Sequence, residues 1–187
     1  MRLLIMGPPG AGKGTQALNI AKSFNIPHIS TGDIFRENMK KQTPLGLEAK
    51  VFYDQGLYVP DDVTNRIVED RLTWDDTQNG FLLDGYPRTI EQVNFLDQIL
   101  LKKSQKIEKV LEITIDIPVV VERLLKRSQE QGRIDDTTEV ITKRLDVYAS
   151  STAPLLAEFQ KRGILTKVDG MGSVSEVEEK IKSALAS

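Results

Sequence analysis

A glycine-rich segment near the start of the chain, GPPGAGKGT at residues 7–15, strongly limits how the chain can fold. It follows a short apolar run, residues 3–6, which predicts a buried strand, and it leads into a helical pattern at residues 15–24. Gly7, Gly12 and Lys13 have the spacing of the phosphate-binding loop G-x-x-x-x-G-K-[ST]. We therefore expect backbone amides at the start of a helix to bind phosphate oxygens, with Lys13 against them.

The rest of the chain alternates between apolar runs and helical patterns. Further strands are predicted at residues 28–30, 81–84, 110–115 and 164–168. Helices are predicted from residue 61, at 89–101, from 118, at 138–161 and from 173, and Pro154 is expected to kink or restart the helix at 138–161. Residue Asp61 is expected to cap its helix, and Ile90 to share the buried face of the helix that follows Thr89. This order predicts an α/β fold of the P-loop NTPase type, a three-layer arrangement around a five-stranded parallel sheet. It is one domain, with an inserted helical flap at residues 30–59 and a short lid at residues 128–136.

Composition excludes several classes of protein. The 187 residues contain 25 Lys and Arg against 27 Asp and Glu, so no excess of positive charge indicates a nucleic-acid or membrane-surface binder. Cysteine is absent, which excludes disulfides and thiolate-bound zinc. With no signal peptide or membrane span evident, we expect a cytoplasmic protein, and a monomer by default.

The phosphate loop departs from its template at one position. Gly14 stands where a Ser or Thr hydroxyl normally binds magnesium. A carboxylate at the end of a neighbouring strand, Asp84, is placed where a hydrated cation beside bound phosphates needs a negative partner. On the residues alone, Asp84 is also compatible with a turn or a helix cap.

Four further stretches carry a family resemblance. They are ISTGDIFR at residues 29–36, YVPDD at 58–62, FLLDGYPRTIEQ at 81–92, and RLLKRSQEQGRIDD at 123–136 followed by KRL at 143–145. In these motifs, which occur in order along the whole chain, the sequence resembles the adenylate kinase family, whose own phosphate loop has glycine after the lysine. Only residues 128–132 separate Arg127 from Arg133, so the chain resembles the short-lid class, which lacks the insert that can carry zinc. The resemblance implies no zinc.

The resemblance also implies a reaction and a set of site residues. The reaction is reversible phosphoryl transfer from MgATP to AMP, which gives two ADP, and the substrates are the small molecules ATP, AMP and ADP, with no nucleic acid or membrane as partner. The implied catalytic residues are Lys13, Arg88, Arg127, Arg133 and Arg144. The implied ATP-binding residues are Gly10, Ala11, Gly12, Lys13, Gly14, Thr15, Arg123, Arg127 and Gly172. The implied AMP-binding residues are Thr31, Arg36, Leu57, Tyr58, Val59, Gly85, Tyr86, Pro87, Arg88, Gln92, Arg133 and Arg144. Magnesium would be held through water by Asp84 and Asp33, with no direct side-chain ligand.

Several of these residues have plainer explanations without the family. Arg123 and Arg127 are four residues apart and fit a solvated helix face, and an isolated Gln92 fits an exposed one. His28, the only histidine, is expected to be structural, because phosphoryl transfer depends on positioning and positive charge more than on a base.

The alternatives differ in acceptor, donor or class. STGD at residues 30–33 and PRTIEQ at 87–92 differ from the SAGD and PRN stretches of related UMP/CMP kinases, which favours AMP as acceptor. A kinase for another monophosphate, or one that uses GTP, is the nearest alternative. A regulatory module that binds nucleotides without transfer is disfavoured, because binding alone does not require arginines from three segments. A nucleic-acid-dependent ATPase is disfavoured by the acidic balance of charge.

Overall fold

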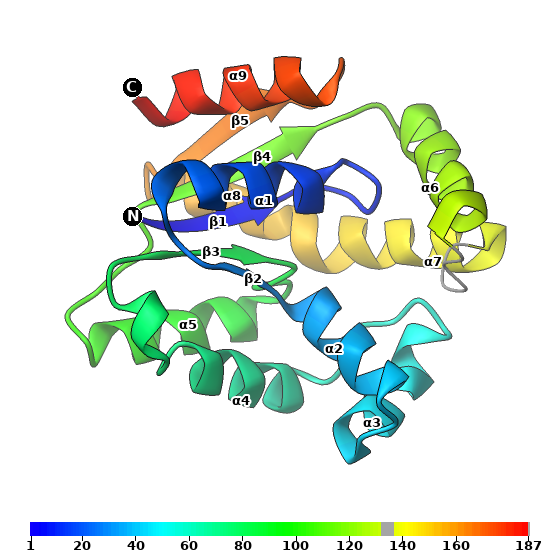
Figure 1. The fold of residues 1–187 in the computed structure, drawn as a ribbon, viewed down its shortest axis with the longest axis horizontal. Helices are drawn as coiled ribbons and strands as arrows, with labels where there is room; N and C mark the ends of the chain where they lie inside the picture. The colour runs from blue at the N-terminus through cyan, green and yellow to red at the C-terminus, as the bar shows by residue number, and fades with distance from the viewer. Residues whose placement is uncertain (132–136, 187) are drawn as a thin grey trace.

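The computed structural model describes residues 1–131 and 137–186 and has an α/β fold. Its five strands form one parallel sheet in the order β2-β3-β1-β4-β5 (Figure 1). The strands are β1 (Arg2–Met6), β2 (His28–Ser30), β3 (Phe81–Asp84), β4 (Lys109–Thr114) and β5 (Leu165–Asp169). The predicted five-stranded parallel sheet is therefore confirmed.

Helices cover both faces of the sheet and extend beyond one of its ends. They are α1 (Lys13–Phe24), α2 (Thr31–Lys40), α3 (Pro44–Tyr53), α4 (Asp61–Arg71), α5 (Ile90–Leu101), α6 (Ile117–Gln131), α7 (Thr138–Val147), α8 (Ala153–Lys161) and α9 (Val174–Ala186). In Figure 1, α1 and α9 lie on one side of the sheet, and α4, α5 and α8 lie on the other. This is the three-layer arrangement predicted from the sequence.

Alternating side chains of β1 supply two separate cores. Leu4 and Met6 belong to the apolar cluster shared with α4, α5 and α8. Leu3 and Ile5 belong to the cluster shared with α1 and α9. Because successive side chains of a strand point to opposite faces, a continuous apolar strand can fill both layers at once. The sheet is thereby a rigid base for the loops that leave its carboxyl ends.

Helices α2 and α3 occupy the segment expected to be the flap, and they share a small core with the start of α4. Phe35, Ala49, Val59 and Val63 form this buried cluster, and Val63 lies on α4. The Ser30 hydroxyl accepts a hydrogen bond from the Asp33 amide at the start of α2. The flap therefore begins directly at the end of β2, beside the site described below.

Two local predictions are wrong, and a third, the restart of a helix at Pro154, is confirmed with one added detail. Pro60, not Asp61, is the N-cap of α4, and Asp61 is the first helical residue. The Ile90 side chain is 45% exposed, so it lies outside the buried face of α5. The helix predicted over residues 138–161 is divided by a π-helical turn, Tyr148–Thr152, and restarts at α8 with Pro154 in its first turn.

The predicted lid lies largely outside the described residues. Residues 128–131 form the end of α6, and residues 132–136 are not described. No helix in the described part of the chain combines the length and the apolar character needed to cross a bilayer.

Candidate active site

The phosphate loop joins β1 to α1. Gly10 and Gly12 have φ angles of +83° and +86°, values that side chains other than glycine rarely adopt. A Cβ at Gly10 would lie 2.9 Å from the Leu124 Cγ of α6, so the loop packs closely on that helix. The first turn of α1 carries no acidic residue. No carboxylate of its own first turn therefore offsets the positive end of the helix, which faces the loop.

Lys13 bends back over this loop. Its Nζ donates hydrogen bonds to the carbonyl oxygens of Gly7 and Pro8, at 2.7 and 2.8 Å. Burial is the main reason why the pKa of Lys13 is lowered from 10.5 to about 8, and the nearby Asp84 carboxylate opposes the shift. Three guanidinium groups lower it further, those of Arg88, Arg144 and Arg127.

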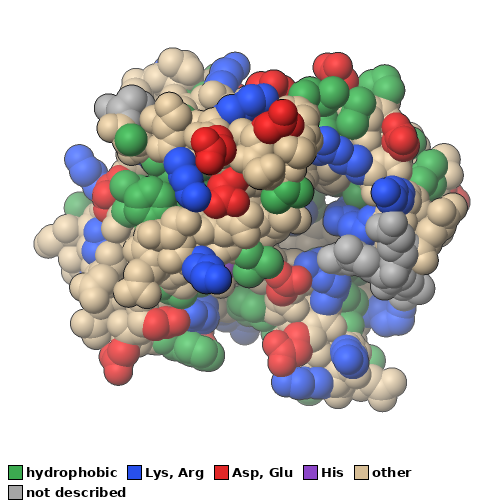
Figure 2. Space-filling view, turned by 45° about the horizontal axis from the view of Figure 1, so that its top comes forward, with side chains coloured by type: hydrophobic (Ala, Val, Ile, Leu, Met, Phe, Trp, Pro, Cys, Tyr) green, Lys and Arg blue, Asp and Glu red, His purple; other side chains and the backbone are tan. Residues whose placement is uncertain are grey.

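The cations around Lys13 come from different parts of the fold. Arg88 lies in the loop between β3 and α5, Arg127 on α6 and Arg144 on α7. In the space-filling view, Lys and Arg side chains gather around a hollow in the surface (Figure 2). Like charges repel, so a fold that brings four of them together is arranged for an anion. Four of the five predicted catalytic residues are thus near one another, and the fifth, Arg133, lies outside the described residues.

Asp84 is the last residue of β3 and is 9% exposed. The Cβ position of Gly14 lies 3.7 Å from Asp84 Oδ2. Because Gly14 has no side chain, nothing at that position covers the Asp84 carboxylate on the side of the phosphate loop. His28 Nε2, on β2, lies 3.5 Å from the same oxygen.

Asp33 forms an ion pair with Arg36 at 2.5 Å. Although partial burial raises the pKa of Asp33, the hydrogen bond and the charge of Arg36 bring it below its usual value.

A pocket between the flap and the β3–α5 loop collects most of the predicted AMP-binding residues. Its cavity volume is about 70 Å³, below the range of about 300–1,000 Å³ typical of ligand sites. It is lined by Thr31, Arg36, Leu57, Tyr58, Val59, Gly85, Arg88, Gln92 and Arg144, together with Pro9, Phe35, Tyr53, Gly56 and Thr64. Two predicted residues, Tyr86 and Pro87, line the neighbouring pocket over Lys13 instead. We call the first pocket the acceptor pocket and the second the phosphate pocket.

Gln92 is buried, contrary to its plain interpretation as a residue on an exposed helix face. Only 1% of its surface is accessible, and both ends of its amide are bonded. The Arg88 backbone amide donates to Oε1 at 2.7 Å, and Nε2 donates to Asp61 Oδ1 at 2.7 Å. Asp61 also accepts from the Thr89 hydroxyl at 2.8 Å. Sequence reasoning interpreted Asp61 as a cap and missed this role, because its partners are distant along the chain.

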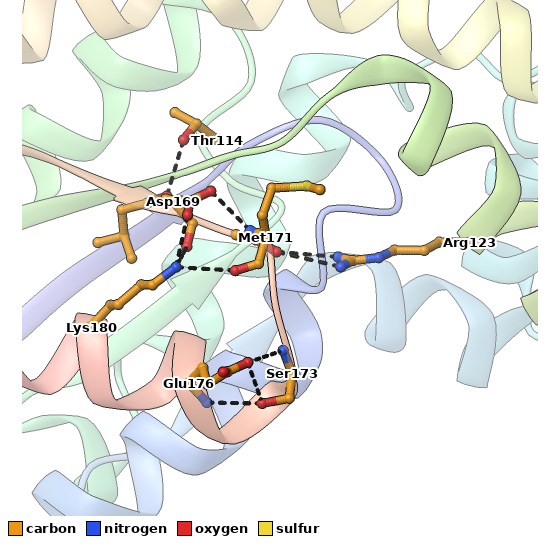
Figure 3. A network of polar contacts seen from close by, with 9 residues as sticks. Thr114, Arg123, Asp169, Met171, Ser173, Glu176 and Lys180 are labelled. Atoms are coloured by element: carbon orange, nitrogen blue, oxygen red, sulfur yellow. Dashed lines mark hydrogen bonds and ion pairs between the residues drawn. The ribbon is translucent and has the colours of Figure 1, made fainter.

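The two residues expected near the ATP base, Arg123 and Gly172, come together at the loop after β5. Arg123 reaches from α6 to the Gly170 carbonyl, with Nη atoms at 3.4 and 3.5 Å (Figure 3). Lys180 of α9 holds the same loop through Asp169 Oδ2, at 2.7 Å, and the Met171 carbonyl, at 3.0 Å. Gly172, in this loop, has a φ of +115°. The two predicted residues of this region, Arg123 and Gly172, are therefore placed at one loop.

The next turn begins α9 with the predicted capping box. Glu176 Oε2 accepts from the Ser173 amide at 2.7 Å, and the Ser173 hydroxyl accepts from the Glu176 amide at 3.3 Å (Figure 3). The loop is thus fixed at both ends, by β5 and by this cap.

Comparison with known proteins identifies the family to which this site belongs. The family model described as adenylate kinase matches residues 5–164. The chain belongs to the adenylate kinase family. Its sequence is 55% identical to an adenylate kinase of Kocuria rhizophila over 184 residues, 98% of each chain. It is 54% identical to one of Renibacterium salmoninarum, over 98% of this chain and 95% of the relative, and 52% identical to one of Pseudarthrobacter chlorophenolicus, over 98% and 96%.

Membership in the adenylate kinase family establishes the reaction. The enzyme transfers a phosphoryl group reversibly from ATP to AMP, and two ADP are the products. The α/β fold with its phosphate loop agrees with this assignment. It is a nucleotide-binding transferase, and the alternative of a regulatory module without transfer is set aside.

Proposed function

We propose that the cations around Lys13 are the catalytic centre of this adenylate kinase. The observation that carries the proposal is geometric: Lys13 is held over the phosphate loop by the Gly7 and Pro8 carbonyls and lines one pocket with Arg88 and Arg144. Burial lowers the pKa of Lys13 most, and the charges of Arg88, Arg144 and Arg127 lower it further. Phosphoryl transfer spreads negative charge over the oxygens of the moving group, and preorganised positive groups stabilise that charge. Lys13 faces the phosphates that the loop binds, and the arginines surround the group in transit. Arg133, which is not described by the structure, belongs to the same proposed set by its place in the sequence motif.

The acceptor pocket is the proposed AMP site. Arg36 and Arg88 provide charges for the AMP phosphate, and both line this pocket. Pro9, Tyr58, Gly85, Arg88 and Arg144 line the acceptor and the phosphate pockets alike. The shared residues mark the passage through which a phosphoryl group would move from ATP to AMP. At about 70 Å³ the acceptor pocket is too small for a nucleotide, so the segments that line it are proposed to open when AMP enters.

Gln92 is proposed to read the adenine of AMP. Its contact with Asp61 fixes Nε2 and Oε1 in position and uses only one of the two N–H groups. The remaining N–H is available to an acceptor nitrogen of the base. The Thr31 hydroxyl donates to the Gly85 carbonyl at 3.0 Å and can accept a hydrogen bond from the base at the same time.

The loop after β5 is the proposed adenine site of ATP. The Arg123 guanidinium lies beside the Gly170 carbonyl and presents a flat cation on which a purine can stack. Gly172 contributes backbone groups only, since it has no side chain, and its φ of +115° is one that glycine adopts readily.

Magnesium is the proposed companion of ATP, and the residues present fit it. Asp84 supplies one nearly buried carboxylate that faces the phosphate loop, and Asp33 lies near the same sheet edge, where Ser30 pairs with Asp84. Magnesium keeps several waters and takes phosphate oxygens as ligands, so carboxylates that orient water suit it. When bound, the ion neutralises charge on the phosphates of ATP. The proposal includes no zinc, and it places a monomeric enzyme in the cytoplasm.

Lys13→Ala tests the catalytic assignment. We expect kcat to fall by about 100-fold or more, with a thermal midpoint close to that of the parent enzyme. Lys22→Ala is the matched control, since Lys22 lies in the last turn of the same helix and is exposed. A folded Lys13→Ala variant with nearly full turnover would overturn the proposed site.

A further inference from the structure

Tyr58 contacts the side chain of Arg88 directly and is linked to its backbone carbonyl through Thr152. The Arg88 guanidinium carbon lies 4.7 Å from the centre of the Tyr58 ring, in cation–π geometry. The Tyr58 hydroxyl lies 2.8 Å from the Thr152 hydroxyl, and that hydroxyl donates to the Arg88 backbone carbonyl at 2.9 Å. Tyr58 therefore reaches the side chain of Arg88 directly and its backbone carbonyl through the Thr152 hydroxyl.

The direction of this relay follows from the number of hydrogens. A threonine hydroxyl carries one hydrogen, and that of Thr152 is given to the Arg88 carbonyl. Tyr58 must then be the donor to Thr152. Thr152 is 5% exposed and both bonds are partly buried, so losing one leaves the Thr152 hydroxyl or its partner with an unsatisfied polar group.

The remaining contacts of Arg88 come from its own loop. Its Nε donates to the Gly85 carbonyl at 2.7 Å, and its backbone amide donates to Gln92. Within residues 1–131 and 137–186, neither Nη nitrogen of Arg88 is assigned a hydrogen bond. The guanidinium is therefore held by its Nε, which is bonded to the Gly85 carbonyl, and by the face that packs on the Tyr58 ring. This leaves the two Nη groups for phosphate oxygens.

We propose that Tyr58 is a positioning residue for phosphoryl transfer, which aims Arg88 through its ring and through the Tyr58–Thr152 relay. The inference rests on the role proposed above for Arg88. Tyr58 precedes α4, Thr152 ends the π-helical turn, and Arg88 follows β3, so the contact joins three segments that are distant in sequence. Tyr58 also lines both the acceptor and the phosphate pockets. Its two contacts thus hold Arg88 where the pockets meet.

Three variants separate the two contacts. Tyr58→Phe keeps the ring and removes the hydroxyl, Thr152→Val removes the middle of the relay, and Tyr58→Leu removes both contacts. We expect kcat to fall about 2- to 5-fold for the first two, and about 10-fold or more for Tyr58→Leu, because small errors in position cost large factors in rate. Tyr58→Phe combined with Thr152→Val should fall no further than either alone, since both interrupt the same relay.

The separate effects on kcat and KM distinguish a Tyr58 that positions Arg88 from a Tyr58 that only lines the acceptor pocket. If Tyr58 only lined the acceptor pocket, Tyr58→Leu would raise the KM for AMP at unchanged kcat, and this result would overturn the inference. The stability control is Trp74→Leu, which removes a comparable cation–π pair, with Arg71 4.5 Å from the Trp74 ring, on the surface. We expect it to lower the thermal midpoint and leave kcat unchanged.

Arg88→Ala separates failure of the inference from failure of the proposed function. If Arg88 has the catalytic role proposed above, Arg88→Ala should lower kcat strongly. Tyr58→Leu should then have no further effect on kcat when it is combined with Arg88→Ala. If Arg88→Ala leaves kcat unchanged, the proposed role of Arg88 fails, and the inference fails with it. If Arg88→Ala lowers kcat but Tyr58→Leu does not, only the inference fails.

Discussion

Gln92 and Asp61 are joined by a 2.7 Å hydrogen bond from Nε2 to Oδ1, which fixes the orientation of the amide that faces the acceptor pocket. A free glutamine amide can rotate and present either its donor or its acceptor to a base. Here the Arg88 amide holds the oxygen and Asp61 holds the nitrogen. The Gln92 amide is therefore oriented by two segments of the chain, residue 61 at the start of α4 and residues 88–92 around the start of α5.

Thr31→Ala combined with Gln92→Asn should relax the preference for AMP over CMP. Asparagine is shorter by one methylene and cannot keep the contact with Asp61 while facing the pocket, and alanine removes the second hydroxyl contact. We expect the ratio of kcat/KM for AMP to that for CMP to fall by about 10-fold or more, the value of one well-placed hydrogen bond. Unchanged selectivity would count against both assignments.

The sequence predicted the sheet, and it missed features that depend on partners distant along the chain. Strand runs, the phosphate loop and the capping box at Ser173 are local patterns, and all three are confirmed. The role of Asp61 depends on Thr89 and Gln92, and no local pattern signals such partners. The π-helical turn is likewise not encoded by a breaker at its own position, since Pro154 follows it.

The charge on Lys13 should depend on whether nucleotide is bound. Its pKa of about 8 lies below the unfolded value of 10.5. Burying the charged Lys13 side chain therefore lowers the free energy of unfolding fully below pH 8, and this loss disappears as the pH rises to 10.5. Bound phosphates oppose the cations that lower this pKa. We therefore expect MgATP binding to take up a fraction of a proton at pH 8.5 and almost none at pH 7, measured by calorimetry in buffers of different ionisation enthalpy.

Lys13→Arg is the control for that measurement. A guanidinium stays protonated throughout this pH range, so the uptake of protons at pH 8.5 should vanish in the variant. Equal uptake in the variant and the parent enzyme would assign the proton to another group.

Asp84→Asn should raise the magnesium concentration needed for half-maximal activity by about 10-fold, because a neutral amide orients the waters of a cation less strongly. Asp33→Asn should have a smaller effect, since the Asp33 carboxylate is paired with Arg36. Activity measured across a magnesium titration, at fixed ATP, checks both. Identical titration curves for parent enzyme and Asp84→Asn would exclude the assigned role.

Gly46→Ala should disturb the flap. Any Cβ at Gly46 would collide with the Asn38 carbonyl, where α3 packs against α2. We expect a loss of about 1–3 kcal/mol in the free energy of unfolding, together with a higher KM for AMP. Gly163→Ala is the control, because nothing lies within 4 Å of its Cβ position and only its φ of +69° is strained. It should lower stability without changing the KM for AMP.

The most direct test of the reaction and its proposed specificity is a product assay of the parent enzyme with MgATP and each of AMP, CMP, UMP and GMP, in which diphosphate formation and phosphate release are counted separately. We expect rapid ADP formation with AMP, little diphosphate with the other acceptors, and phosphate release far slower than transfer. Comparable turnover with CMP or UMP would contradict the assignment of Thr31 and Gln92, and rapid phosphate release would contradict a site that delivers the phosphoryl group to AMP rather than to water.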